Sequence, residues 1–176
     1  MEVKPYSRYS GTIVSIGNFS YSLNKIPEEF KLVANIVDED TEEKIINLIS
    51  NRKEIELKQI MKCIAAEFQP ELKYTLNDFT FGKIKTGDGM PPEKEDSKYY
   101  NPCVVVINLG TDIEMSFIDT KTKRQYSIMI PRRSMFLFQD KEFKYQRSIT
   151  KRFVDKNDNR EYKREDRYSL VFKSRK

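Results

Sequence analysis

Apolar residues in the first half of the chain recur at the spacing of α-helices. A first helix is predicted after Asp38, because Asp38, Asp40 and Thr41 can cap its start and acidic residues follow in its first turn. A second helix is predicted over residues 54–68, and Pro70 ends it. Its apolar stripe consists of Leu57, Ile60, Met61, Ile64 and Phe68. The first helix carries its own stripe, with Ile45, Ile46, Leu48 and Ile49 at helical spacing. Both stripes are interpreted as surfaces that face a core.

After Leu76 the apolar positions follow the two-residue period of β-strands. The polar segment 120–123 has the length of a hairpin connection, and two longer segments, 86–100 and 155–166, are predicted to be loops. The second of these is expected to be exposed and mobile. Strands are predicted at 79–81, 103–109, 113–118, 125–130, 134–138, near 148–149 and at 167–173. Several short strands after two helices indicate an α+β domain whose core is a sandwich or barrel.

The chain length of 176 residues suits one domain with a single core. Residues 1–25 are expected to form an arm or strand around the stretch Thr12–Val14, and residues 26–176 to form the domain. Although 34% of residues are charged, 11 Phe and 10 Tyr supply enough aromatic bulk for a core, which excludes a wholly disordered chain.

Several features indicate a cytoplasmic protein. No apolar stretch approaches the roughly 20 residues that span a bilayer, and residues 1–9 lack the apolar run of a signal peptide. Cys63 and Cys103 lie in apolar settings without CxxC spacing. They are therefore predicted to be two buried, reduced thiols.

Charge is divided unevenly along the chain. Residues 121–176 contain 18 Lys and Arg against 7 Asp and Glu, a net of +11, whereas residues 1–120 carry a net of −6. A positive end or face attracts polyanions, among which nucleic acid is the first candidate. The alternative is a solvated surface on which the two signs interleave.

Four stretches in the second half occur in the order known from one enzyme family. They are Gly-Asp-Gly-Met-Pro-Pro at 87–92, Val-Val-Ile-Asn-Leu-Gly at 105–110, Met-Ile-Pro-Arg-Arg-Ser-Met-Phe-Leu at 129–137 and Arg-Tyr-Ser-Leu-Val-Phe-Lys at 167–173. Together they resemble the AlkB-like Fe(II)/2-oxoglutarate oxygenases, closest to the branch that acts on the wobble uridine of transfer RNA. The resemblance implies a double-stranded β-helix, or jelly roll, with the N-terminal helices packed on it.

The same resemblance locates the metal ligands, and the residues there differ from the family pattern. The His-x-Asp motif of the family corresponds to Glu93-Lys94-Glu95, and its distal histidine to Arg147; the chain contains no histidine at all. Fe(II) in such a site needs two imidazoles and a carboxylate, and a guanidinium stays protonated and has no lone pair to give. We therefore expect no metal and no cofactor. Arg147 is expected to lie close to Glu93 or Glu95 and to take over the electrostatic role of the ion.

The positions that contact 2-oxoglutarate in the family have also changed. Its Asn-x-Tyr motif corresponds to Gly82-Lys83-Ile84, and its last arginine to Lys173, which keeps the charge but not the bidentate geometry. Arg167 is retained and is interpreted as satisfying buried polar partners. The sequence also lacks G-x-S-x-G, Walker and zinc-finger motifs, and without histidine it excludes Ser/His and Cys/His catalysis.

The resemblance and the charge together predict a catalytically inactive protein that binds RNA, with the ribosome or a transfer-RNA site as its target. We expect the chain to work without the RNA-recognition and methyltransferase domains of the transfer-RNA enzymes. One alternative is a noncatalytic partner of a transfer-RNA modification enzyme, and another is an active oxygenase with atypical iron ligands. The candidate RNA-binding residues are Arg132, Arg133, Lys144, Lys151, Arg152, Arg160, Lys163, Arg164, Arg175 and Lys176.

Overall fold

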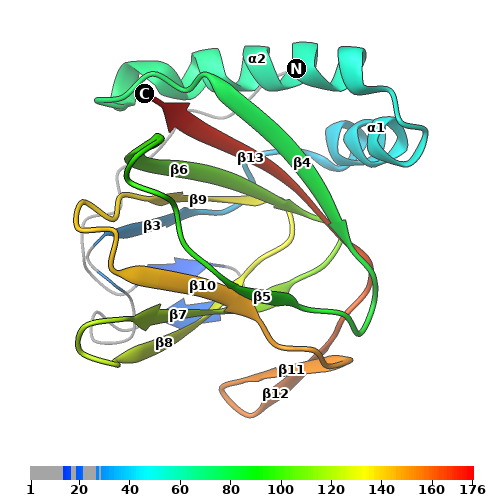
Figure 1. Ribbon diagram of the computed structural model, residues 1–176. Helices are drawn as coiled ribbons and strands as arrows, with labels where there is room; N and C mark the ends of the chain where they lie inside the picture. The colour runs from blue at the N-terminus through cyan, green and yellow to red at the C-terminus, as the bar shows by residue number, and fades with distance from the viewer. Residues whose placement is uncertain (1–13, 17–18, 22–26, 28) are drawn as a thin grey trace.

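Two antiparallel sheets lie face to face, and two helices cover the outer face of the larger sheet (Figure 1). The computed structural model describes residues 14–16, 19–21, 27 and 29–176. The larger sheet has the order β3 (Phe30–Val33), β9 (Ser134–Phe138), β6 (Tyr100–Leu109), β13 (Arg167–Arg175) and β4 (Asp78–Ile84). The smaller sheet has the order β5 (Met90–Glu93), β10 (Tyr145–Ile149), β7 (Ile113–Asp119) and β8 (Gln125–Ile130). Two further pairs are β1 (Val14–Ile16) with β2 (Phe19–Tyr21), and β11 (Val154–Asn157) with β12 (Arg160–Lys163).

The two helices form where the apolar stripes predict them. Helix α1 (Glu39–Ser50) begins after Asp38, whose carboxylate accepts a hydrogen bond of 2.8 Å from the backbone N–H of Thr41. Helix α2 (Glu54–Phe68) has the predicted bounds, and the 3₁₀ turn η2 (Gln69–Glu71) that follows it contains Pro70. Capping and stripe spacing are local properties, and this is why the sequence predicts both helices closely.

Alternation along β6 divides the core into two layers. Cys103, Val105, Ile107 and Leu109 pack against the helices, whereas Val104 and Val106 point between the sheets. The inter-sheet layer is built on aromatic rings: the ring centroid of Phe30 lies 5.3 Å from that of Phe117 and 5.3 Å from that of Phe136. A sheet buried on both faces explains why β6 is a nearly continuous apolar run. The predicted α+β jelly roll is confirmed.

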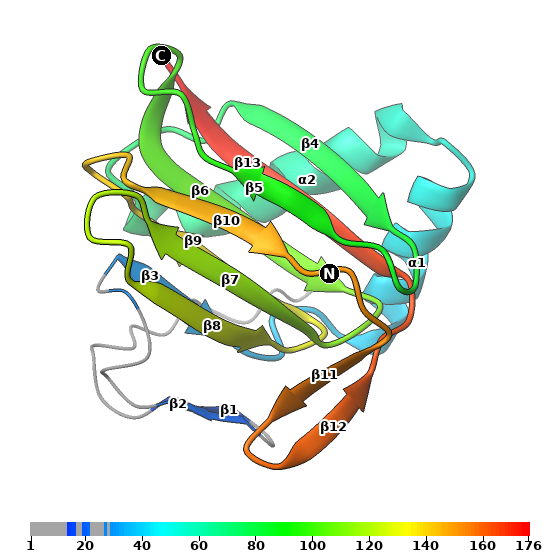
Figure 2. The same cartoon turned by 60° about the horizontal axis from the view of Figure 1, so that its bottom comes forward.

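Three predictions from the sequence, two loops and one buried cysteine, are wrong in detail. The predicted loop 86–100 contains β5, and the predicted mobile loop 155–166 contains the β11–β12 hairpin (Figure 2). That hairpin turns at Asp158 and Asn159, with φ of +47° and +64°, a turn that Asp and Asn tolerate better than most residues. Cys103 is buried as predicted, but Cys63 is exposed because it lies off the apolar stripe of α2.

The division of the chain into an arm, residues 1–25, and a domain, residues 26–176, stays a prediction, and most of the arm lies outside the described residues. Among the helices that the structure describes, none is both long and apolar enough to cross a membrane.

Candidate functional site

Strand β10 places Arg147 between the two sheets. Its neighbours at alternate positions, Tyr145 and Ile149, belong to the inter-sheet core, and Arg147 is 7% exposed. Across β10 the residue pairs with Phe117 of β7 on one side and with Glu93 of β5 on the other. The backbone register therefore brings side by side the two segments in which the resemblance expects metal ligands.

Glu95 is the carboxylate that meets Arg147. Its Oε1 lies 2.6 Å from Arg147 Nη2, and its Oε2 lies 2.9 Å from Nζ of Lys173 on β13. One carboxylate thus joins two cations that come from opposite sheets. Glu93, the other candidate, is exposed. The predicted pairing of Arg147 is confirmed, with Glu95 as the partner.

Aromatic and acidic residues extend this ion cluster. The ammonium of Lys173 also lies 5.1 Å from the ring centroid of Tyr100, whose hydroxyl donates to Asp78 at 2.9 Å. Burial lowers the pKa of the Arg147 guanidinium, and the charges of Glu95 and Glu93 oppose that shift. An arginine remains protonated in proteins, so the cluster is held by full charges.

The space beside the ion pair is small. A pocket lined by Glu95, Arg147, Phe138, Asp140 and Tyr145, among others, has a volume of about 10 Å³. This is roughly the space of one water molecule. A dicarboxylic acid does not fit in this pocket.

Arg167 lies in the same interior with a neutral partner. Its Nε donates to the Asn108 side-chain oxygen at 2.8 Å, and burial together with the charge of Arg147 lowers its pKa to about 10. Gly82 and Ile84 lie across the β4–β13 pair, opposite Ser169 and Arg167. Asn108 was not among the predicted site residues, although a polar residue inside the apolar run 103–109 is the signal that marks it.

The donor set here does not fit Fe(II). The carboxylate of Glu95 is already shared by two cations, and Arg147 occupies the position where the resemblance requires an imidazole. Within the described part of the chain, no group of three or more His, Cys, Asp or Glu side chains is arranged to hold a metal ion.

The glycine-rich approach to β5 is required by close packing. A Cβ on Gly89 would lie 2.2 Å from the carbonyl oxygen of Ile149 and 2.9 Å from the backbone nitrogen of Lys151. At Gly87, where φ is +85°, a Cβ would meet the ring of Phe153 at 2.5 Å. These contacts hold the segment before β5 against the end of β10. They therefore fix the position of the segment that carries Glu93 and Glu95.

Replacing Gly89 by alanine is expected to destabilise the fold by about 1–3 kcal/mol, because backbone atoms that meet the new methyl group have no side-chain freedom with which to yield. Urea unfolding followed by circular dichroism measures the change. Gly82→Ala is the matched control, since a Cβ there meets only Ser169 Oγ, at an ordinary 3.5 Å. Equal destabilisation by the two changes would contradict this account.

Half of the predicted RNA-binding residues form ion pairs with acidic residues of the same chain. Arg164 is the clearest correction: its guanidinium is 2% exposed and is bound to Asp155, so a phosphate has no access to it. The other four pair at the surface or partly inside it, as Arg132 with Glu42, Arg133 with Glu39, Lys144 with Glu29 and Asp119, and Arg152 with Glu114 and Asp155.

The other five candidates, Lys151, Arg160, Lys163, Arg175 and Lys176, are exposed. Because Arg147, Arg164 and Arg167 are all buried, part of the positive excess in residues 121–176 lies inside the molecule. Of the aromatic residues that interleave with these basic ones, Tyr145 and Tyr168 are core, and Phe153 is 68% exposed. The charge count alone could not separate internal from external arginines.

The two facing sheets with helices on the larger one define the class of fold, an α+β jelly roll. Among solved structures, a Pseudomonas putida prolyl-4-hydroxylase is similar over 84% of this chain and 86% of its own, with a TM-score of 0.56 and 12% identity. A prolyl hydroxylase from Trichoplax adhaerens, solved with a hypoxia-inducible-factor peptide fragment, is similar over 83% and 84%, with a TM-score of 0.56 and 9% identity. No family model and no curated protein matches this sequence. Similarity at this identity establishes the fold alone.

Proposed function

We propose that this chain is a catalytically inactive protein of AlkB-like descent that works by binding RNA. One observation carries the loss of catalysis: the guanidinium of Arg147 and the ammonium of Lys173 hold Glu95 where the resemblance puts the iron. A buried cation bound to a carboxylate keeps the charges of the site balanced without a metal. The retained strands and motifs then serve as a scaffold.

The choice of RNA as the ligand rests on charge and descent. Surface lysines and arginines on the C-terminal half, including Lys151, Arg160 and Lys163, are exposed and can neutralise phosphates. The branch that the sequence resembles acts on transfer RNA. We therefore propose a cytoplasmic factor that docks on the ribosome or on a transfer-RNA site and occupies it.

Purified protein is expected to sediment with ribosomes, or to bind transfer RNA, at about 50 mM salt and to be released well before about 500 mM, because salt competes with phosphate contacts. In parallel, 2-oxoglutarate with Fe(II) and ascorbate is expected to give no succinate above a protein-free blank. Absence of binding even at low salt would contradict the RNA proposal. Iron-dependent succinate formation would contradict the proposed loss of catalysis.

A noncatalytic partner of a transfer-RNA modification enzyme is the second candidate. The exposed apolar side chains of Phe153 (68%) and Ile55 (75%) favour it, since such residues are common in protein interfaces. A complex that survives nuclease treatment and high salt would support this candidate, because apolar contacts are not screened by ions.

A further inference from the structure

Three surface turns and the C-terminus meet at one end of the sandwich (Figures 1 and 2). The C-terminal Lys176 bonds to the β5–β6 connection, with its N–H on Tyr99 O at 2.9 Å and its ammonium on Ser97 O at 2.7 Å. The β7–β8 turn bonds to the β9–β10 connection through Thr120 N and Lys144 O at 2.8 Å. Residues of both the β5–β6 and β9–β10 connections line the small pocket beside Arg147, so all four segments form one surface.

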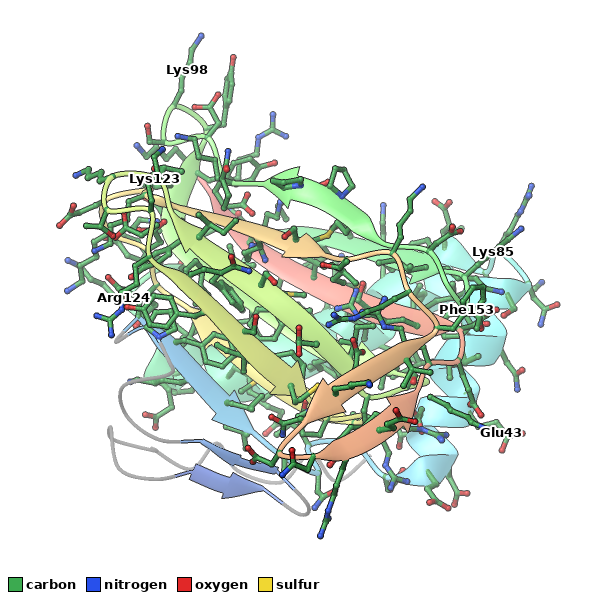
Figure 3. The ribbon with its side chains drawn as sticks, turned by 90° about the horizontal axis from the view of Figure 1, so that it is seen from below. Glu43, Lys85, Lys98, Lys123, Arg124 and Phe153 are labelled. Carbon is green, nitrogen blue, oxygen red and sulfur yellow. The ribbon has the colours of Figure 1, made fainter. Side chains whose placement is uncertain are left out.

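We call this surface the cationic end and define it by the exposed residues Lys94, Lys98, Lys123, Lys141 and Arg175. None of the five forms an ion pair with another residue in the part of the chain that the structure describes, whereas Lys121 beside them is paired with Glu142 at 2.7 Å. Arg124 adds to the same end, and Figure 3 shows Lys98, Lys123 and Arg124 projecting from it.

Acidic residues at this end offset only part of the charge. Asp119 and Asp140 are buried, Glu142 is already paired with a lysine, and the exposed Asp96 accepts a hydrogen bond of 2.8 Å from the backbone N–H of Lys98 through Oδ1. Cations without an ion-pair partner attract a polyanion, and attraction is strongest where several lie on one rigid surface. Each of the three connections, β5–β6, β7–β8 and β9–β10, is held at both ends by a strand of one of the two antiparallel sheets.

An exposed aromatic ring lies among these cations. Tyr99 is 47% exposed, and the ammonium of Lys98 lies 5.0 Å from its ring centroid. An aromatic face beside cations suits an unpaired nucleobase, which stacks on the ring while its phosphates meet the ammonium groups. An acidic protein segment would use the charges but not the ring.

We infer that the cationic end is the surface that binds RNA, with phosphates on Lys94, Lys98, Lys123, Lys141 and Arg175 and an unpaired base on Tyr99. The inference rests on the proposed function and names the surface that would carry it out. Among the residues expected from the sequence alone, Lys144, Arg175 and Lys176 lie at this end, and Lys144 is already paired with Glu29 and Asp119. The hairpin cations Lys151, Arg160 and Lys163 are a separate set.

The test compares two triple variants by fluorescence anisotropy on a labelled RNA hairpin with a single-stranded overhang. K98Q/K123N/K141Q removes three of the five cations that define the cationic end, with Asn at 123 because φ is +64° there. K44Q/K58Q/K62Q removes three exposed lysines from α1 and α2 and serves as the control. We expect the slope of log affinity against log salt to fall by about two to three for the first variant and to stay constant for the control, since each lost phosphate contact removes about 0.7–0.9.

Tyr99→Ala tests the base contact separately. It is expected to weaken binding of the overhang RNA by roughly fivefold or more, with little effect on a blunt duplex of the same length. If the wild type binds and the cationic-end variant, shown by circular dichroism to be folded, binds equally well, the inference is wrong while the proposed function stands. If the wild type binds neither RNA at low salt, the proposed function fails. If polyglutamate binds as tightly and loses the same affinity in the variant, the commitment to RNA is overturned.

Discussion

Replacing Glu95 by alanine is expected to lower the free energy of unfolding by about 3–5 kcal/mol. The Arg147 side chain is 9% exposed, and its ion-pair partner is Glu95 at 2.6 Å. Without that carboxylate, the guanidinium stays charged in the interior, and Lys173 also loses its partner at 2.9 Å. Urea unfolding, with the slope against denaturant compared between variants, measures the loss.

Glu93→Ala is the matched control, because Glu93 is an exposed carboxylate two residues away on the same segment. Its effect is expected to stay within about 0.5 kcal/mol, the range of ordinary surface substitutions. A loss as large as that of Glu95→Ala would mean that the whole segment, and not the ion pair, determines stability.

The double variant Arg147→Met with Glu95→Leu tests what the pair contributes. Removing both charges is expected to restore most of the stability that the single change loses, since apolar groups of similar size can replace a buried ion pair. Such a result would mean that Arg147 and Glu95 compensate each other's burial. Continued loss in the double variant would show that further groups depend on both side chains.

What the sequence could predict depends on whether the determining contacts are local. Helix α1 follows from its cap and its apolar stripe, helix α2 from its stripe and Pro70, and β6 from a long apolar run. The pairing of Arg147 with a carboxylate followed only from a family pattern, because the two residues are 52 positions apart. No periodicity within a segment could have indicated that contact.

The missed elements are those whose residues look polar but are held by tertiary contacts. Strand β5 consists of Met90–Glu93 and contains two prolines. Prolines are compatible with an edge strand, which β5 is, but in the sequence they favour the prediction of a loop. The β11–β12 hairpin was read as a mobile loop because of its charges, yet Asp155 is fully buried and Arg164 nearly so. Burial of paired charges is invisible to hydropathy, and it also explains why Arg164 was wrongly expected on the surface.

Asp155→Asn is expected to destabilise the protein by about 3–5 kcal/mol, by detaching this hairpin from β7. The carboxylate accepts hydrogen bonds from Arg164 Nε at 2.8 Å and Nη2 at 2.7 Å, from Arg152 Nε at 2.7 Å and from Glu114 N at 3.1 Å. Asparagine keeps the shape but turns an amide donor toward cationic donors, leaving Arg164 buried without an anion.

The acid dependence of stability gives an independent check. Although burial acts to raise it, the hydrogen bonds from Arg164 and its other donors lower the pKa of Asp155 below its ordinary value of 3.8. A carboxyl group whose pKa is depressed by folding stabilises the protein above the unfolded pKa, and this contribution is lost as the pH falls through the folded one. The stability difference between wild type and Asp155→Asn is therefore expected to be constant from pH 5 to 7, on the order of the full effect, and to shrink below about pH 4. Glu161→Ala, which removes an exposed carboxylate paired with Lys156 at 3.4 Å on the same hairpin, is expected to show neither the loss nor this pH dependence.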